Sequence, residues 1–121
     1  MSAANKARGS RWEADIEGYL NDTYGIKARR LPRAGAKDIG DVAIELKNGH
    51  VIVVEAKNTK VAQLKEFLRQ AEVEADHYEQ KYHCPTYGVV AMKARQQGTG
   101  DGRIVLTIDT LAELLKWCEL A

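Results

Sequence analysis

The sequence lacks the long apolar segments and paired cysteines of membrane-spanning and disulfide-bonded proteins. Apolar runs such as residues 51–54 are far too short to cross a membrane, and the N-terminus has no apolar signal core. The only two cysteines, Cys84 and Cys118, lack C-x-x-C spacing and a secreted context, so we expect reduced structural thiols. These absences predict a protein that stays in the cytosol.

Zinc-binding patterns are also missing, because His50, His77 and His83 match no zinc motif and are interpreted as non-ligands. The chain has 121 residues, of which 45% are hydrophobic and 29% are charged, as in ordinary globular proteins. This length suits one domain with a real core and is too short for two. We expect a flexible basic arm over residues 1–9 and a single domain over residues 10–121.

The chain has no large excess of positive or negative charge, since 18 basic and 17 acidic residues give a net charge of +1. The basic residues are unevenly distributed, however: residues 26–37 hold five of them and no acid, and three more lie near the N-terminus. Such clusters supply contacts to nucleic-acid phosphates, whereas a solvated basic face is the alternative. Because the cluster leads directly into Asp41, a nucleic-acid approach is favoured.

Residues 37–57 are the stretch around which the rest of the chain is organised, and they indicate a β-hairpin. Residues 41–46 alternate polar and apolar, and an Asn-Gly turn signal and a β-branched run follow. Side chains two positions apart on a strand share a face. The second strand therefore presents the carboxylate of Glu55 and the ammonium of Lys57 side by side.

Asp41 lies at the start of the neighbouring strand, so that Glu55 and Lys57 together with Asp41 can form a catalytic metal site. Two carboxylates on adjacent strands can hold a hard divalent cation such as Mg²⁺, which lowers the pKa of a bound water and neutralises charge on a phosphodiester. Lys57 can orient the nucleophile or stabilise the transition state. The alternative is that Glu55 and Lys57 form an ordinary solvated pair, but Asp41 and the basic cluster favour the metal site.

Residues 10–13 form a capping box, with serine at the N-cap and Glu13 at N3, and predict a helix from Ser10 to about Thr23. Glu13 borders the buried stripe that contains Trp12 and Ile16. From there it can face the hairpin. Position alone leaves two roles open for Glu13, a helix cap or a metal ligand, and one carboxylate can partly serve both.

Asp41, the Glu55-Ala56-Lys57 triplet and Glu13 resemble the aspartate, E-x-K triplet and first-helix glutamate of the PD-(D/E)xK nucleases, most closely the small archaeal and phage Holliday-junction resolvases. The similarity extends from about residue 8 to residue 60. It implies that Asp41, Glu55 and Glu13 bind Mg²⁺, with Mn²⁺ as a possible substitute. It also implies that Lys57 completes a catalytic set of Glu13, Asp41, Glu55 and Lys57.

The sequence departs from the family pattern at two places before Asp41. Ile39-Gly40 stands where the family name expects proline, and Asp38 is an additional acid. The start of the alternating strand favours Asp41 as the metal ligand, and a contribution from Asp38 stays open.

The resemblance also implies DNA as the partner, a homodimer, and the cytoplasm of a bacterial, archaeal or phage-infected cell. The basic residues that we expect to contact DNA are Lys6, Arg8, Arg11, Arg29, Arg30, Arg33, Lys37 and Lys60.

Before the hairpin, the sequence predicts a strand over residues 26–31 and a loop over residues 32–40. After the hairpin, it predicts a helix from about residue 59 to Pro85 and strands over residues 86–92 and 103–108. A second capping box, Asp109 with Glu113, predicts the start of a last helix. The loop at residues 93–102 is either a plain connection or a clamp on DNA. The resulting order, α-β-β-β-α-β-β-α, predicts an α/β restriction-endonuclease-like fold with a mixed central sheet. Boundaries carry an error of about two to four residues.

Both later helices have an apolar stripe that we expect to be buried. In the first, a dimer seam is the alternative to core packing. The stripe residues are Val61, Leu64, Leu68, Ala71, Ala75, Tyr78 and Tyr82 in the first helix, and Leu111, Leu114, Leu115 and Cys118 in the second.

The expected activity is that of a Mg²⁺-dependent, structure-selective DNA endonuclease that resolves four-way junctions by paired nicks. Alternatives are a nuclease of the same class with another DNA substrate, such as a nickase, a restriction-type enzyme or a repair nuclease, and a non-catalytic DNA-binding module.

Overall fold

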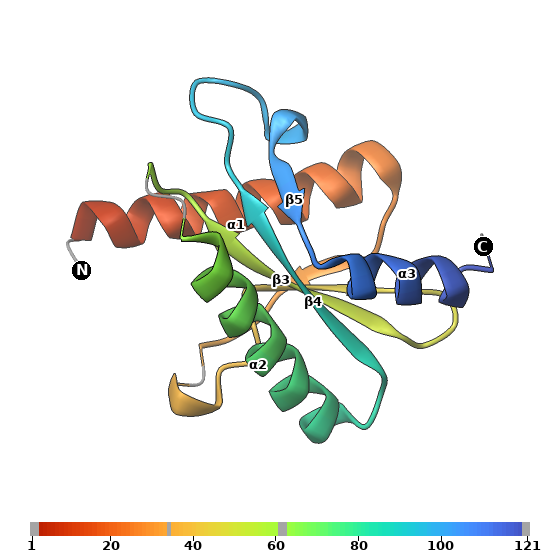
Figure 1. The fold of residues 1–121 in the computed structure, drawn as a ribbon. Helices are drawn as coiled ribbons and strands as arrows, with labels where there is room; N and C mark the ends of the chain where they lie inside the picture. The colour runs from red at the N-terminus through yellow and green to blue at the C-terminus, as the bar shows by residue number, and fades with distance from the viewer. Residues whose placement is uncertain (1–2, 34, 61–62, 120–121) are drawn as a thin grey trace.

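The computed structural model describes residues 3–33, 35–60 and 63–119. Within these ranges the predicted order of helices and strands is confirmed (Figure 1). The elements are α1 (Ala3–Tyr24), β1 (Ala28–Arg30), β2 (Val42–Glu45), β3 (Val51–Lys57), α2 (Leu64–Tyr82), β4 (Thr86–Met92), β5 (Arg103–Val105) and α3 (Ile108–Trp117), with 3₁₀ turns at Gly35–Lys37 and Thr99–Asp101.

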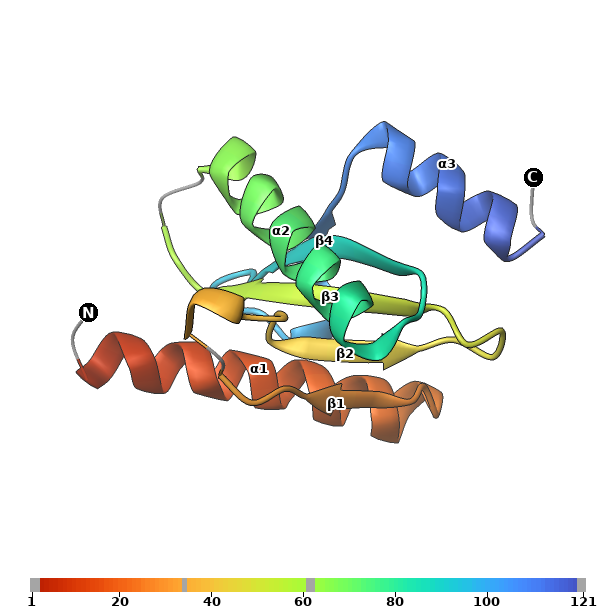
Figure 2. The same ribbon diagram turned by 90° about the horizontal axis from the view of Figure 1, so that it is seen from below.

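The five strands form one mixed sheet in the order β1-β2-β3-β4-β5. Neighbours are antiparallel except β3 and β4, which are parallel and joined by the α2 crossover. Figure 2 shows α1 on one face of the sheet, and α2 and α3 on the other. The sheet is therefore covered on both faces, which explains the nearly continuous apolar runs of β3 and β4.

The core has two layers, one on each face of the sheet. Alternate residues of each strand supply the two layers because successive side chains point to opposite faces. The layer under α1 contains Trp12, Ile16, Ala28, Val42, Val54, Val89 and Ala91, and the layer under α2 contains Leu31, Ile39, Ala43, Val51, Val53, Ala75 and Tyr78.

Trp12 anchors α1 to the far half of the sheet. Its side chain is buried, and its indole Nε1 donates a hydrogen bond to the Ala91 carbonyl oxygen of β4 at 3.1 Å. Gly102, just before β5, comes so close to the Trp12 ring that a Cβ there would lie 2.9 Å from it. The tryptophan thus fixes the position of α1 relative to the loop that joins β4 and β5.

Helix α2 lies unusually close to β4 because Gly88 has no side chain. A Cβ at this position would collide with the carbonyl oxygen of Ala71 in α2. Ala71 and Ala75 are both buried, as expected for small residues that allow close packing. This contact sets the distance between α2 and the two central strands.

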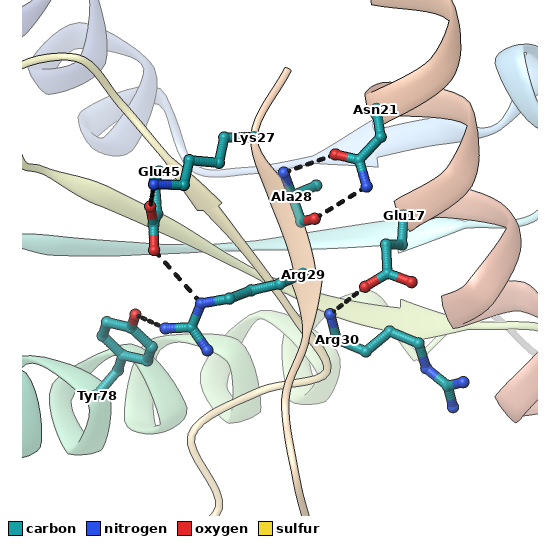
Figure 3. Close-up of polar contacts among 8 residues, drawn as sticks. All are labelled: Glu17, Asn21, Lys27, Ala28, Arg29, Arg30, Glu45 and Tyr78. Carbon is teal, nitrogen blue, oxygen red and sulfur yellow. Dashed lines mark hydrogen bonds and ion pairs between the residues drawn. The ribbon is translucent and has the colours of Figure 1, made fainter. Parts of the chain in front are cut away.

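Side chains of α1 bind the backbone of β1 (Figure 3). The Asn21 amide accepts from the Ala28 backbone N–H at 3.0 Å and donates to the Ala28 carbonyl oxygen at 3.1 Å. The Glu17 carboxylate accepts from the Arg30 backbone N–H at 2.7 Å. A strand of only three residues is thereby held on both sides, by β2 and by α1.

The start of α1 corrects the sequence-based prediction. The helix begins at Ala3 rather than at Ser10, so the segment expected to be a flexible arm, residues 1–9, is helical from Ala3 onward. Alanine, lysine and arginine are favourable in helices and outweigh the capping signal. The Ser10 hydroxyl instead accepts a hydrogen bond from Arg30 at 2.9 Å. Glu13 therefore lies inside the helix, and the capping role is excluded.

The boundaries of α2 also differ from the prediction. The helix begins at Leu64, not near residue 59, and Val61 lies outside the described residues. The middle of the predicted stripe is buried, but its ends, Leu64 and Tyr82, are exposed. His77 lies within this helix.

The C-terminal elements show the largest differences. Strand β5 ends at Val105, and Thr107 is the N-cap of α3, where its hydroxyl accepts from the Thr110 N–H at 3.0 Å. The predicted buried face of α3 is wrong, because no residue of α3 is buried and Leu111 is 46% exposed. The helix is held instead by Trp117, whose ring packs edge-on against Tyr87. None of the described helices has the length and apolar character needed to cross a membrane.

Candidate active site

Asp41 and Glu55 lie opposite each other at one end of the β2–β3 hairpin. The register pairs Val42 with Val54, and the Asp41 backbone N–H donates to the Val54 carbonyl oxygen at 3.0 Å, which continues the pairing by one residue. The Ala56 N–H donates to the Asp41 carboxylate at 2.8 Å. Both acids are buried, with exposed fractions of 7% and 5%. The hairpin thus brings two carboxylates together away from bulk water.

Gly40 explains the missing proline before Asp41. Its φ angle is +104°, which glycine adopts readily and proline, fixed near −65°, cannot. A Cβ at this position would also lie 3.2 Å from the Val53 side chain. In this chain the turn that delivers Asp41 to the sheet depends on glycine, while the preceding Ile39 is buried in the core.

Lys57 is held beside Glu55 by two residues of α2. Its ammonium lies 3.6 Å from a Glu55 oxygen and donates to the Gln70 side-chain oxygen at 3.1 Å. It also lies 4.8 Å from the centre of the Phe67 ring, a favourable cation–π distance. Gln70 and Phe67 were not predicted as site residues, yet they determine where the lysine points.

Glu74 of α2 is a buried acid that the sequence analysis did not assign to the site. It is only 4% exposed and interacts with Glu55. Burial raises the pKa of Glu74 to about 7. The signal was present in the sequence, because Glu74 lies three residues after Ala71 and four before Tyr78, on the same stripe of the helix.

Glu13 reaches the same cleft from α1, on the opposite face of the sheet from α2. Its carboxylate is buried and pairs with Arg33 at 3.4 Å and with Arg30 at 3.7 Å. Burial and the nearby Asp41 raise the pKa of Glu13. The structure therefore brings together Glu13, Asp41, Glu55 and Lys57, the four residues that the sequence analysis selected.

Burial and mutual repulsion control the protonation of the central acids. Burial, the charge of Glu55 and a hydrogen bond with it raise the pKa of Asp41 to about 7. Burial and Glu74 raise the pKa of Glu55 to about 8, although Lys57 acts in the opposite direction. At neutral pH these carboxyl groups are therefore partly protonated, and a nearby cation would favour loss of the protons.

Asp38 lies beside the central acids but differs from Asp41 in its environment. It is half-buried, and the His77 Nδ1 lies 2.9 Å from its backbone carbonyl oxygen. One oxygen each of Asp38, Glu55 and Glu74 is buried without a hydrogen-bond partner. Buried acceptors are normally satisfied, so these oxygens are available to a ligand or an ordered water.

The acids lie in an open cleft of about 1040 Å³. Part of the predicted basic set lines this cleft, whereas Arg11 lines an adjacent hollow and Lys37 and Arg29 line neither. Arg29 points instead towards Tyr78 and Glu45, with a hydrogen bond of 2.8 Å to the Tyr78 hydroxyl (Figure 3). The basic residues in the cleft wall are Lys6, Arg8, Arg30, Arg33, Lys57, Lys60 and Arg95.

A family model described as phage putative PDDEXK endonuclease matches residues 4–100 of the chain. The chain belongs to this PD-(D/E)xK family. The match includes α1, the hairpin, α2 and β4, and hence every residue of the candidate site. A comparison with curated proteins found no match.

PD-(D/E)xK nucleases are generally dependent on divalent metal ions, and the donor set here fits one. Among the residues that the structure describes, no three His, Cys, Asp or Glu side chains are arranged to hold a metal by themselves. Mg²⁺ commonly uses only one or two carboxylates and completes its shell with waters and substrate phosphate. The facing carboxylates of Asp41 and Glu55, with an unpartnered oxygen on Glu55, meet this requirement.

Proposed function

We propose that this PD-(D/E)xK protein is a Mg²⁺-dependent endonuclease that hydrolyses DNA phosphodiester bonds and acts on four-way junctions. One observation carries the proposal: Asp41 and Glu55 face each other across the hairpin, with Lys57 held 3.6 Å from Glu55. These residues lie in an open cleft with basic residues along its wall. A buried acid pair beside basic residues suits a phosphodiester and a cation together.

Each site residue has a distinct role in this proposal. Asp41 and Glu55 would hold the cation, with Glu13 completing the site, and the cation would supply charge neutralisation and water activation. Lys57 orients the attacking water and donates to the developing negative charge on the phosphate oxygens. Gln70 fixes the Lys57 ammonium through their 3.1 Å hydrogen bond. Arg30 and Arg33, which pair with Glu13 in this structure, are positioned to contact phosphates.

The choice of a four-way junction rests on shape and symmetry. The sequence contains no zinc module that would read base edges, so phosphate geometry carries the selectivity. Resolution of a junction needs two symmetric nicks, while a single site cuts one strand at a time. A two-fold homodimer supplies two sites at a fixed separation.

The alternative of a non-catalytic DNA-binding module is disfavoured by the buried acids. Asp41, Glu55 and Glu74 have raised pKa values because they are buried together. Such a cluster destabilises the fold and weakens phosphate binding unless a cation joins it. A module that only binds DNA gains nothing from it.

The test is cleavage of four labelled substrates: a four-way junction, a linear duplex, a single strand and an RNA. Each is incubated with Mg²⁺, with Mn²⁺ and with chelator. We expect paired incisions near the branch point of the junction, only when metal is present, and binding to the junction at least about tenfold tighter than to duplex. Cutting of linear duplex with equal efficiency would favour a nickase, restriction-type or repair nuclease. Cleavage in chelator would contradict the metal site.

A further inference from the structure

A second, more basic hollow opens beside the catalytic cleft. It has a volume of about 440 Å³ and contains five basic side chains and one acid, Asp15. Some of the basic residues line both spaces, so the hollow continues the cleft rather than standing apart from it. The basic residues are Arg8, Arg11, Lys60, Lys93 and Arg95, of which Arg8, Lys60 and Arg95 are shared with the cleft.

The positive charge of this hollow is less compensated than that of the catalytic cleft. In the cleft, Arg30 and Arg33 pair with Glu13, and Lys57 pairs with Glu55. Among the described residues no carboxylate forms an ion pair with any of four basic residues of the hollow. These four are Arg11, Lys60, Lys93 and Arg95. The hollow therefore carries a local excess of positive charge, although the net charge of the whole chain is close to zero.

The wall of the hollow is fixed to the catalytic strand. The Lys93 backbone N–H donates to the Lys57 carbonyl oxygen at 3.0 Å, so the two lysines leave neighbouring strands at the same end of the sheet. The Lys93 ammonium lies 5.3 Å from the centre of the Trp12 ring. Trp12 in turn is tied to Ala91 of β4 by its indole hydrogen bond. The spacing between hollow and active site is therefore set by the core.

From this placement we infer that the hollow binds the sugar-phosphate backbone of the DNA that flanks the scissile phosphate. The inference rests on the proposed nuclease function and extends it with Lys93 and Arg95, which lie outside the basic clusters near the N-terminus and before Asp41. Lysine and arginine side chains are common donors to the phosphate oxygens of DNA. The flanking DNA thus contributes affinity and fixes the direction in which the strand crosses the site.

The test compares the double variant Arg11→Gln/Lys93→Met with Lys47→Met, an exposed lysine at the far turn of the hairpin that lines neither space. Methionine at position 93 keeps the aliphatic contact with Trp12, and thermal melting verifies that both variants fold. Binding to a fluorescent 30-base-pair duplex is measured in chelator across a salt series. Each lost phosphate contact lowers the salt slope by about 0.9. The double variant should lose about 1.8 units of slope and about tenfold in affinity, while Lys47→Met stays unchanged.

A shortened duplex provides the second arm. Shortening the duplex on the side that contacts the hollow should weaken binding by wild type as much as the double substitution weakens binding to the full duplex. The same shortening should not weaken binding by the double variant any further. An unchanged salt slope in the double variant would overturn the inference. Failure of wild type to cleave any DNA would instead overturn the nuclease function.

Discussion

Asp41 and Glu55 show at the scale of single residues how burial changes the protonation of two facing acids. Each acid is buried, and the two face each other, so their pKa values rise towards 7 and 8. Lys57 opposes the shift at Glu55 but does not abolish it. The folded protein therefore disfavours the charged forms of both acids, and a divalent cation beside them would remove this penalty.

Removal of any central site residue should abolish cleavage without abolishing DNA binding. Asp41→Asn, Glu55→Gln and Lys57→Ala should each lower the cleavage rate about 100-fold or more, because they remove the chemistry and leave the basic wall intact. Affinity for DNA in chelator should change by less than about threefold. Cleavage within a few-fold of wild type would contradict the role of the residue concerned.

Gln70→Ala should lower the cleavage rate about tenfold with little change in KM, because the Lys57 ammonium loses the hydrogen bond that orients it. The neighbouring Arg69→Ala is a matched control, since Arg69 is exposed and pairs with Glu66 on the surface of α2. Equal rates for Gln70→Ala and Arg69→Ala would show that the lysine needs no positioning residue.

The raised pKa values predict that the metal-free protein is less stable at alkaline pH. Stability from protonated Asp41 and Glu55 is fully present below their ordinary pKa values of about 4 and is lost as pH rises through about 7 and 8. In chelator, Tm should therefore fall between pH 6 and pH 9, by about 5 °C. Asp41→Asn should flatten this fall, and millimolar Mg²⁺ should stabilise wild type more than the variant. Equal Mg²⁺ shifts in the two proteins would argue against a metal site at Asp41.

The residues that sequence patterns identified are those with a local signal. Asp41, Glu55 and Lys57 are marked by strand alternation, and Glu13 by its place beside an apolar stripe. For Lys93 and Arg95 the sequence indicated a loop that is either a plain connection or a clamp on DNA, but not the position of that loop beside the hairpin. Gln70 has no such signal, because its role depends on where the α2 crossover returns to the hairpin. Local periodicity does not encode that return.

Among the secondary-structure elements, α2 owes its position against β4 to the absence of a side chain at Gly88. Gly88 of β4 leaves room for the Ala71 carbonyl oxygen, and α2 carries Gln70 and Glu74 into the site on the same turns of helix. The position of the helix and the geometry of Lys57 are therefore linked through one glycine.

Gly88→Ala should destabilise the protein by about 1–3 kcal/mol, because the added methyl group forces α2 away from the sheet. Gly18→Ala in α1 is the matched control, for which we expect a change in stability of the opposite sign. Its Cβ would meet nothing closer than 4.0 Å, and alanine should stabilise the helix by about 1 kcal/mol. Urea unfolding measures both, and similar effects of the two changes would contradict the close contact.

The order of elements was predictable from sequence, whereas several ends were not. Alternation and turn signals defined the hairpin, and apolar spacing defined α2. The start of α1 was misplaced because Ser10 looks like a cap although the preceding residues also favour helix. The burial of α3 was overestimated, since periodicity indicates an apolar face but not whether anything covers it.

At the scale of the whole molecule, the family match ends at residue 100, before β5 and α3. These last elements carry exposed apolar side chains, including Ile104 and Ile108, the latter 85% exposed. The matched segment therefore contains all four residues of the candidate site, whereas Ile104 and Ile108 lie outside it.

A junction-resolving enzyme should be a dimer at working concentration. Light scattering at micromolar protein, with and without junction DNA, should give twice the mass of one chain, about 27 kDa from a chain of 13.5 kDa. A monomer under both conditions would contradict symmetric resolution and favour a nickase or repair nuclease.

The hydrogen bonds from Asn21 and Glu17 to β1 limit how two copies can meet. Side chains of α1 already bind the outward-facing N–H and C=O of Ala28 and the outward-facing N–H of Arg30. The β1 edge of the sheet therefore offers few free backbone groups to an incoming strand. Two chains cannot readily merge their sheets there into one continuous ladder. A dimer must instead join through the β5 margin or through helices and loops. Substitutions of Asn21 would then expose a strand template and favour strand-mediated self-association.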